Sequence, residues 1–210
     1  MTPLPADAPR GARLPRQARR TQLLSAAQAV FVVQGYHAAA MDDIAERAGV
    51  SKPVLYQHFP SKLELYLALL DQHAEVLVGR VHEALGSTTD NHARVTASVQ
   101  AYFDFVDGEG TPGEGAFRLL FESDLRNDPA VRERVERMTM QCVEAIARTI
   151  AHDTGYREEE ALLLSVALSG AAEVSARWWL DGAGTVPKDR AVELLVGLLW
   201  RGLAGSPLTA

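Results

Sequence analysis

The sequence predicts an all-α protein in which an N-terminal head of three helices, including a helix-turn-helix, precedes a larger helical domain. Apolar residues recur at spacings of three and four along most of the chain, and no segment alternates apolar and polar residues as a strand would. Gly, Pro, Ser or Asp mark the ends of the periodic segments. The 210 residues are 47% hydrophobic and 23% charged, which is the composition of an ordinary globular protein.

The head is expected to contain three short helices. The first begins at Arg16 and is stopped by Gly35, and the second covers 41–49 with acidic residues in its first turn. The third covers 51–59 and follows the second after the short turn "GVS". Two helices joined in this way are typical of a helix-turn-helix, in which the first helix braces and the second reads DNA.

A long fourth helix begins at the capping box of Ser61 and Glu64 and runs to about Leu85. Further on, the sequence "NDP" predicts an Asp cap with proline in the first turn of another long helix. A Gly- and Glu-rich loop is expected over 107–115, and the remaining helices are expected at about 89–106, 116–126, 129–152, 157–180 and 187–203. The resulting division is a disordered basic arm (1–15), a helix-turn-helix domain (16–62) and a second helical domain (63–210).

Charge is distributed unevenly along the chain. Residues 1–62 hold eight Lys or Arg against four Asp or Glu, whereas the rest of the chain holds 13 against 23. The net charge of −6 by itself argues against nucleic acid. A basic head on an acidic body is nevertheless expected when one end meets a polyanion. A disordered basic tail without a partner is the alternative explanation.

The helix over 51–59 has a narrow apolar side. At about 100° per residue, Leu55 and Phe59 lie about 40° apart and define the side that faces the core. Most of the circumference is therefore left for a partner. The residues outside the apolar side are Lys52, Pro53, Val54, Tyr56, Gln57 and His58.

The chemistry of this free surface suits a DNA major groove. The Gln57 amide can bond adenine through two hydrogen bonds, and Val54 can pack on a thymine methyl group. Lys52 and Lys62 stand at the two ends of the helix, where phosphates of the groove would lie.

The stretch "MDDIAERAGVSKPVLYQHFPSK" at 41–62 resembles the TetR family of transcriptional regulators, and the likeness extends back through 19–38. The resemblance implies a double-stranded DNA operator as partner, with phosphate contacts from Tyr56 and Lys62. It also implies base contacts from residues 52, 54 and 57 and a helix cap from Ser51. The full set that we expect at DNA is Arg19, Arg20, Ser51, Lys52, Pro53, Val54, Tyr56, Gln57, His58 and Lys62.

One part of the head departs from the family pattern. The family commonly has Thr or Ser before the second helix, where it touches phosphate, but this chain has Ala39 and Ala40. Arginines of the N-terminal arm are expected to replace that contact. His58 is either a polar contact on the flank of the helix or a pH sensor.

The last two helices are the expected surface for a homodimer, since one reading helix alone reads too few bases to be selective. Small residues over 161–180 allow close approach, and the resemblance implies a four-helix interface. The alternative is that the tryptophans fill the monomer core. The expected interface residues are Leu168, Trp178, Trp179, Leu195 and Leu199.

The middle helices carry the aromatic and sulfur-containing residues that could line an effector cavity: Tyr102, Phe103, Phe117, Phe121, Met138 and Cys142. Such a cavity would be apolar and would take a hydrophobic or amphipathic ligand. The stretch "VLYQHFPSKLELYLALLD" is similar to actinobacterial regulators of fatty-acid synthesis, which implies a lipid or acyl-CoA-like effector. We expect a repressor that this ligand releases; a ligand-dependent activator and an effector-independent DNA-binding protein remain as alternatives.

Several other functions are not supported by the sequence. No His pair has metal-ligand spacing, no loop has the Lys-Ser/Thr of a phosphate-binding motif, and no nucleophile–base pair can be located. We therefore expect no metal, no cofactor and no catalytic activity. The absence of a long uncharged apolar run, of a secretory signal and of a second cysteine predicts a cytoplasmic protein without a membrane span.

Overall fold

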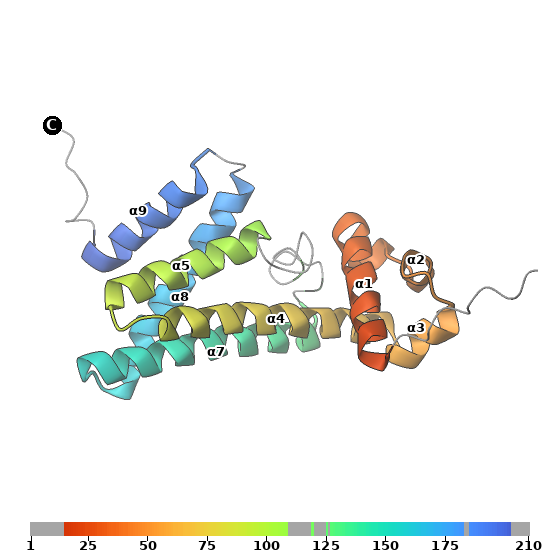
Figure 1. Ribbon diagram of the computed structural model, residues 1–210, viewed down its shortest axis with the longest axis horizontal. Helices are drawn as coiled ribbons and strands as arrows, with labels where there is room; N and C mark the ends of the chain where they lie inside the picture. Colours follow the sequence, from red (N-terminus) through yellow and green to blue (C-terminus); the bar gives the residue numbers. More distant parts are fainter. Residues whose placement is uncertain (1–14, 109–118, 120–124, 126, 183–184, 203–210) are drawn as a thin grey trace, which may run out of the picture.

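The computed structural model describes residues 15–108, 119, 125, 127–182 and 185–202, and none of these residues lies in a strand. The all-α prediction is confirmed. Most of the expected helix over 116–126, the arm before Pro15 and most of the expected loop over 107–115 lie outside the described residues. With the labels of Figure 1, the helices are α1 (Arg16–Ala38), α2 (Met41–Arg47), α3 (Lys52–His58), α4 (Lys62–Gly86), α5 (Asn91–Asp107), α7 (Pro129–Thr154), α8 (Glu158–Asp181) and α9 (Lys188–Arg201).

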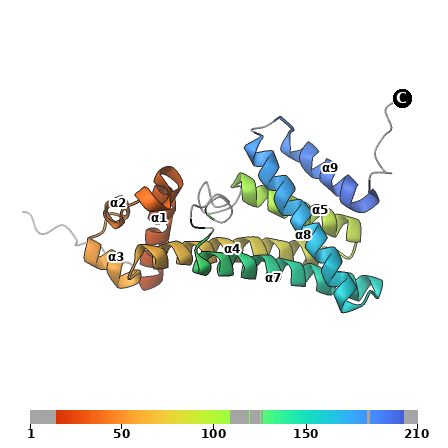
Figure 2. The ribbon, with the colours of Figure 1, turned by 180° about the vertical axis from the view of Figure 1, so that it is seen from behind.

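The head and the body occupy opposite ends of the molecule. Figure 1 shows α1, α2 and α3 gathered at one end, and α4 runs from them into the body. In the body α7 lies along α4, α5 packs on α4, α8 and α9, and α8 crosses behind in the view of Figure 1 and in front in Figure 2. No helix among the described residues is both long and apolar enough to cross a membrane.

The core of the head fixes the angle between α2 and α3. Ile44 and Leu55 are fully buried in the core cluster that also holds the apolar residues of α1. Gly49 turns the chain between the two helices with φ of 64°, and its N–H donates to Glu46 O at 2.9 Å. Gln22 on α1 donates from Nε2 to Ala48 O at 2.8 Å, which ties the end of α2 to the first helix.

Side-chain caps form at two helix starts, as the sequence predicts. The side-chain cap expected at a third helix start does not form. Ser61 Oγ accepts from Glu64 N at 3.1 Å at the start of α4, and Asp128 Oδ1 accepts from Ala130 N at 2.8 Å at the start of α7. Ser51 stands at the N-cap of α3, but its side chain makes no cap hydrogen bond. The Ser51 backbone carbonyl accepts a hydrogen bond from the Val54 N–H at 3.0 Å, and the expected side-chain cap is absent.

An aromatic cluster joins the head to the body at the first turns of α4. Tyr66 is buried, and its ring lies 5.3 Å from Phe31 and 5.2 Å from Tyr36, both of α1. Its hydroxyl donates to Leu119 O at 2.7 Å. One side chain of α4 therefore contacts the head and a segment of the body at the same time.

Gly35 interrupts α1 before this cluster. Its φ of 75° and ψ of 166° lie outside the helical region, although the helix bounds extend to Ala38. These angles are essentially restricted to glycine. The glycine thus lets the chain turn so that Tyr36 reaches Tyr66, which agrees with the helix stop predicted there.

Gly35→Ala is expected to lower the free energy of unfolding by about 1–3 kcal/mol, because alanine is strained at these angles. Gly79→Ala is the matched control, since Gly79 lies within α4 and a Cβ there would meet nothing within 4 Å. The control should stabilise the protein by about 0.5–1 kcal/mol. Urea unfolding followed by circular dichroism measures both; a destabilisation by Gly79→Ala equal to that by Gly35→Ala would contradict the account.

Candidate nucleic-acid interface and ligand pocket

The exposed surface of α3 is the candidate DNA-reading face. Leu55 and Phe59 are 0% and 2% exposed, so they form the buried side of this helix. On the other sides, Lys52, Pro53, Tyr56 and Gln57 are exposed, and Val54 and His58 are half-buried. The helix is therefore held by two side chains and offers the remaining circumference to a partner.

Arginines from α1 lie beside the C-terminal end of α3. Burial lowers the pKa of His58, and the charges of Arg16, Arg20 and Arg19 lower it further. The Arg20 guanidinium also lies 4.5 Å from the centre of the Phe59 ring. The structure thus brings Arg19 and Arg20 to the reading helix, together with Arg16, which is absent from the set expected at DNA. Its spacing of three and four from the other two could have indicated that all three share one helix face.

Lys52 and Lys62 have different surroundings. Lys52 Nζ lies 2.5 Å from Asp42 Oδ2 in an exposed pair that links α3 to α2. Lys62 Nζ instead donates to three backbone carbonyls that follow the Gly35 turn, Tyr36 O at 2.8 Å, His37 O at 3.2 Å and Ala39 O at 2.9 Å. It also lies 4.6 Å from the centre of the Tyr36 ring. An ammonium group has three donors, so Lys62 has none left for the phosphate contact that the resemblance implies.

A cavity of about 420 Å³ lies in the body, at the end of α4 away from the head. Its apolar wall comes from α5, α7 and α8, with Val95, Val99, Ile146, Ile150, Leu168 and Ala172 among the lining residues. Trp200 of α9 closes one side and lies edge-on to His92 at 5.2 Å. This is the size and chemistry of a site for a small apolar or amphipathic molecule.

The structure places the expected pocket residues in two groups. Tyr102 lines the cavity, and its hydroxyl lies 2.7 Å from Ser169 Oγ. Phe103, Met138 and Cys142 are buried in the core but are not among the lining residues. Phe103 turns away because it contacts Trp179, with ring centres 5.5 Å apart. The other expected residues, Phe117 and Phe121, lie outside the described part of the chain.

An apolar stripe is exposed along α8 and α9. On α8 it follows Leu163, Val166, Val174 and Trp178, which are 71%, 50%, 52% and 66% exposed. Leu194 and Leu198 continue it on α9. Of the expected interface residues only Trp178 belongs to this stripe: Leu195 is buried, and Leu168, Trp179 and Leu199 are half-buried against the core. The tryptophans therefore divide between surface and core.

A helix-turn-helix head with a basic, exposed reading face on a helical body defines a DNA-binding transcriptional regulator. Residues 23–69 match the family described as bacterial regulatory proteins, tetR family. Residues 92–202 match the tetracyclin repressor-like C-terminal domain. The chain belongs to the TetR family of transcriptional regulators.

Known relatives extend over nearly the whole chain. The HTH-type transcriptional activator FasR of Mycolicibacterium smegmatis is 49% identical over 95% of this chain and 90% of its own length. The HTH-type transcriptional repressor KstR2 of Rhodococcus jostii is 27% identical over 97% of this chain and 98% of its own. FadR from Bacillus subtilis superposes with a TM-score of 0.72 over 87% of this chain and 98% of that one, and at 16% identity it shows the fold alone. The family and these relatives are regulators and not enzymes.

Lys62→Met is expected to lower the free energy of unfolding by about 1–3 kcal/mol, because three carbonyls are deprived of a charged donor. It should leave the salt dependence of DNA binding unchanged. The matched comparison Arg16→Met, at an exposed arginine of α1 near the reading helix, should keep stability and reduce the slope of log K against log salt by about 0.9 for each phosphate that is no longer neutralised. Urea unfolding and DNA titrations over a range of salt measure the two effects. A reduced slope for Lys62→Met would return this residue to the DNA interface.

Gln57→Ala is expected to relax the choice of base at one position in each half-site. The discrimination in favour of the preferred base pair should fall by about 1–3 kcal/mol with little change in salt slope, because Gln57 is expected to face a base and not a phosphate. Competition binding with half-sites varied base by base measures this. Gln141→Ala, at an exposed position of α7 far from the head, is the control. An unchanged base preference at every position would move the sequence choice to Lys52 or Val54.

Proposed function

We propose that this regulator acts as a homodimer whose affinity for its operator is set by an apolar or amphipathic ligand in the α5–α7–α8–α9 cavity. The observation that carries the proposal is the cavity itself. It is apolar, and its lining includes Leu85 at the end of α4, the helix that also packs against the head. In this proposal residues 16–62 bind DNA, 63–210 bind ligand and partner subunit, and the protein works in the cytoplasm, where its DNA lies.

For the DNA contacts we propose the exposed side of α3 together with the arginines of α1. Lys52, Val54 and Gln57 would face bases, and Tyr56 would contact phosphate. Arg16, Arg19 and Arg20 would supply the phosphate contacts that Ala39 and Ala40 do not. Their position beside His58 supports this assignment.

For the dimer we propose the α8–α9 stripe as the contact. Its members on α8 follow spacings of three and four through Gly170, where a Cβ would meet nothing within 4 Å. The stripe therefore has a flat, open centre that two helices can approach closely. Exposed contiguous apolar surface of this kind marks an interaction site.

The ligand class is supported by the cavity and by a structural neighbour. FadR from Bacillus subtilis, which shares the fold, was solved in complex with stearoyl-CoA. A lipid or acyl-CoA-like ligand suits the apolar wall described above.

Different relatives support activation and repression of transcription. The 49% identical relative is an activator, which favours ligand-dependent activation. KstR2, at 27% identity, is a repressor, which favours release of a repressor by its ligand. Since the first likeness is much stronger, we favour the activator, and the expectation of a repressor is the second candidate.

Val174→Glu is expected to convert the dimer to monomer, because it buries two charges in the centre of an apolar contact. Val33→Glu is the matched control, since Val33 is 83% exposed on α1 and lies off the stripe. Sedimentation velocity at micromolar concentration distinguishes the species. A Val174→Glu protein that stays dimeric, or a wild-type protein that is only monomeric, contradicts the proposed interface.

Lauric acid or dodecanoyl-CoA is expected to change operator affinity by about 5- to 150-fold, the range of typical coupling between two sites. Fluorescence anisotropy with duplexes selected from a random library measures it. Weaker binding supports release, and stronger binding supports ligand-dependent recruitment. Ala167→Phe, which narrows the cavity at an exposed lining position, should remove the response and keep DNA binding. Tight DNA binding that no lipid alters would support the effector-independent alternative.

A further inference from the structure

One end of the ligand cavity carries charged groups, although most of its wall is apolar. Along α5 the lining residues run Asn91, Arg94, Ser98 and Tyr102, so one helix face passes from charged at its start to neutral further in. Asp153 at the end of α7 lies at the same rim. Such a gradient fits a molecule with one polar head and one apolar tail.

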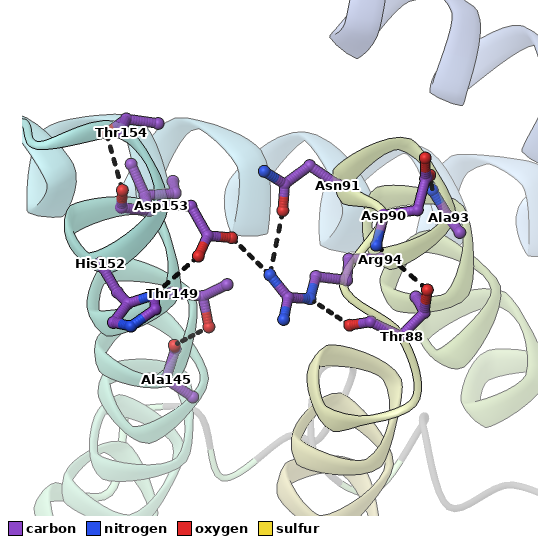
Figure 3. Close-up of polar contacts among 11 residues, drawn as sticks. Thr88, Asp90, Asn91, Ala93, Arg94, Ala145, Thr149, His152, Asp153 and Thr154 are labelled. Atoms are coloured by element: carbon purple, nitrogen blue, oxygen red, sulfur yellow. Dashed lines mark hydrogen bonds and ion pairs between the residues drawn. The ribbon is translucent and has the colours of Figure 1, made fainter.

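Arg94 is fixed at this rim by hydrogen bonds on two of its three nitrogens (Figure 3). Its Nε donates to Thr88 O at 2.6 Å, and its Nη1 donates to Asn91 Oδ1 at 3.1 Å and to Asp153 Oδ2. The side chain is only 16% exposed. Among the described residues no acceptor is found for Nη2, so this nitrogen can donate to a ligand while the others hold the side chain in place.

Asp153, by contrast, has both carboxylate oxygens engaged. Oδ2 accepts from Arg94, and Oδ1 lies 2.8 Å from His152 Nδ1. The hydrogen bond from His152, followed by the Arg94 charge and by Asn91, lowers the pKa of this carboxyl group. Asp153 therefore stays ionised as the counterion of Arg94 and has little capacity left to accept from a ligand.

The other polar groups at the cavity add donors. Ser98 Oγ is buried and has no partner within the described part of the chain. The hydroxyls of Thr149 and Thr154 already donate to Ala145 O and Ile150 O, at 3.2 Å and 2.7 Å. Arg94 and Ser98 are thus the two largely buried donors left to pair along α5, and an acceptor-rich head satisfies both.

We propose that Arg94 binds the anionic head group of the ligand, so that this site selects a single-chain amphiphile bearing a carboxylate or phosphate over one with a neutral or cationic head. This inference rests on the proposed function of the cavity. Asp153 is the counterion of Arg94 in the free protein and shares it with the ligand in the complex. Since the Arg94–Asp153 pair ties the start of α5 to the end of α7, an anion that shares the Arg94 charge also weakens this tie.

The test compares ligands that share one tail and differ in the head: lauric acid, 1-dodecanol, dodecylamine and dodecanoyl-CoA. Isothermal titration calorimetry on the full chain gives their affinities. Lauric acid or dodecanoyl-CoA should bind about 10- to 100-fold tighter than 1-dodecanol, the range expected for a charged hydrogen bond. Tighter binding of lauric acid identifies a carboxylate as the head group, and tighter binding of dodecanoyl-CoA identifies a phosphate.

Variants assign the preference to Arg94. Arg94→Gln should abolish the difference in affinity between the anions and 1-dodecanol, and Arg94→Lys should retain part of this difference. Arg148→Gln, an exposed position on α7 outside the cavity lining, is the matched control and should behave as wild type. Asp153→Asn should strengthen the preference for the anion, which keeps the inference testable if Arg94→Gln fails to fold.

The outcomes separate the inference from the proposed function. Equal binding of lauric acid, dodecanoyl-CoA and 1-dodecanol overturns the anionic head and leaves the apolar cavity as the ligand site. Preference for dodecylamine overturns it in favour of Asp153 as the anchor. An anion preference that survives in Arg94→Gln overturns the role of Arg94. Binding of none of the four amphiphiles overturns the cavity as a lipid site, and with it the proposed function.

Discussion

The joint between α1 and α4 holds the two halves of this protein together. Helix α4 packs against α1 in the head and against α5 and α7 in the body. Its first turns carry Lys62, which binds the carbonyls that follow Gly35, and Tyr66, whose ring packs between Phe31 and Tyr36. Because Tyr66 also donates to Leu119 O, this one side chain contacts both the head and the body.

In the function proposed above, this joint would connect the cavity to the distant DNA-reading face. The cavity lies at one end of α4 and the reading helix lies beyond the other. A ligand can change DNA binding only if it interacts differently with two arrangements of the protein. In the proposed complex, the Arg94–Asp153 pair at the cavity would supply an interaction that differs between the free and ligand-bound states, and α4 connects that end of the body to the head. In the proposed dimer a shift of α4 would change the spacing of the two reading helices.

The sequence predicted those features that depend on local chemistry. Helix starts at Ser61 and Asp128 follow from capping, and the buried side of α3 follows from helical periodicity, because this short helix contacts the core on one side only. The role of Lys62 could not be predicted, since its acceptors lie 23 to 26 residues away in the chain and come together only through the turn at Gly35.

The cavity and the apolar stripe depend on packing between helices. Tyr102 and Phe103 are neighbours in sequence, yet one lines the cavity and the other packs on Trp179. Apolar residues surround much of α8, so composition alone does not distinguish Leu168, which faces inward, from Leu163, which is exposed. Which side of each helix faces its neighbour is decided by the tertiary arrangement.

The central claim is that a ligand in the cavity moves the heads through α4, and the distance between the two heads of the dimer tests it most directly. A spin label at Val33→Cys on α1, in a Cys142→Ala background that removes the only native cysteine, allows double electron–electron resonance. We predict that the amphiphile that alters operator affinity also shifts the distance distribution. The shift should shrink in Tyr66→Phe, which keeps the aromatic cluster but cannot donate to Leu119 O. An unchanged distribution at a ligand concentration that changes DNA affinity would contradict the account.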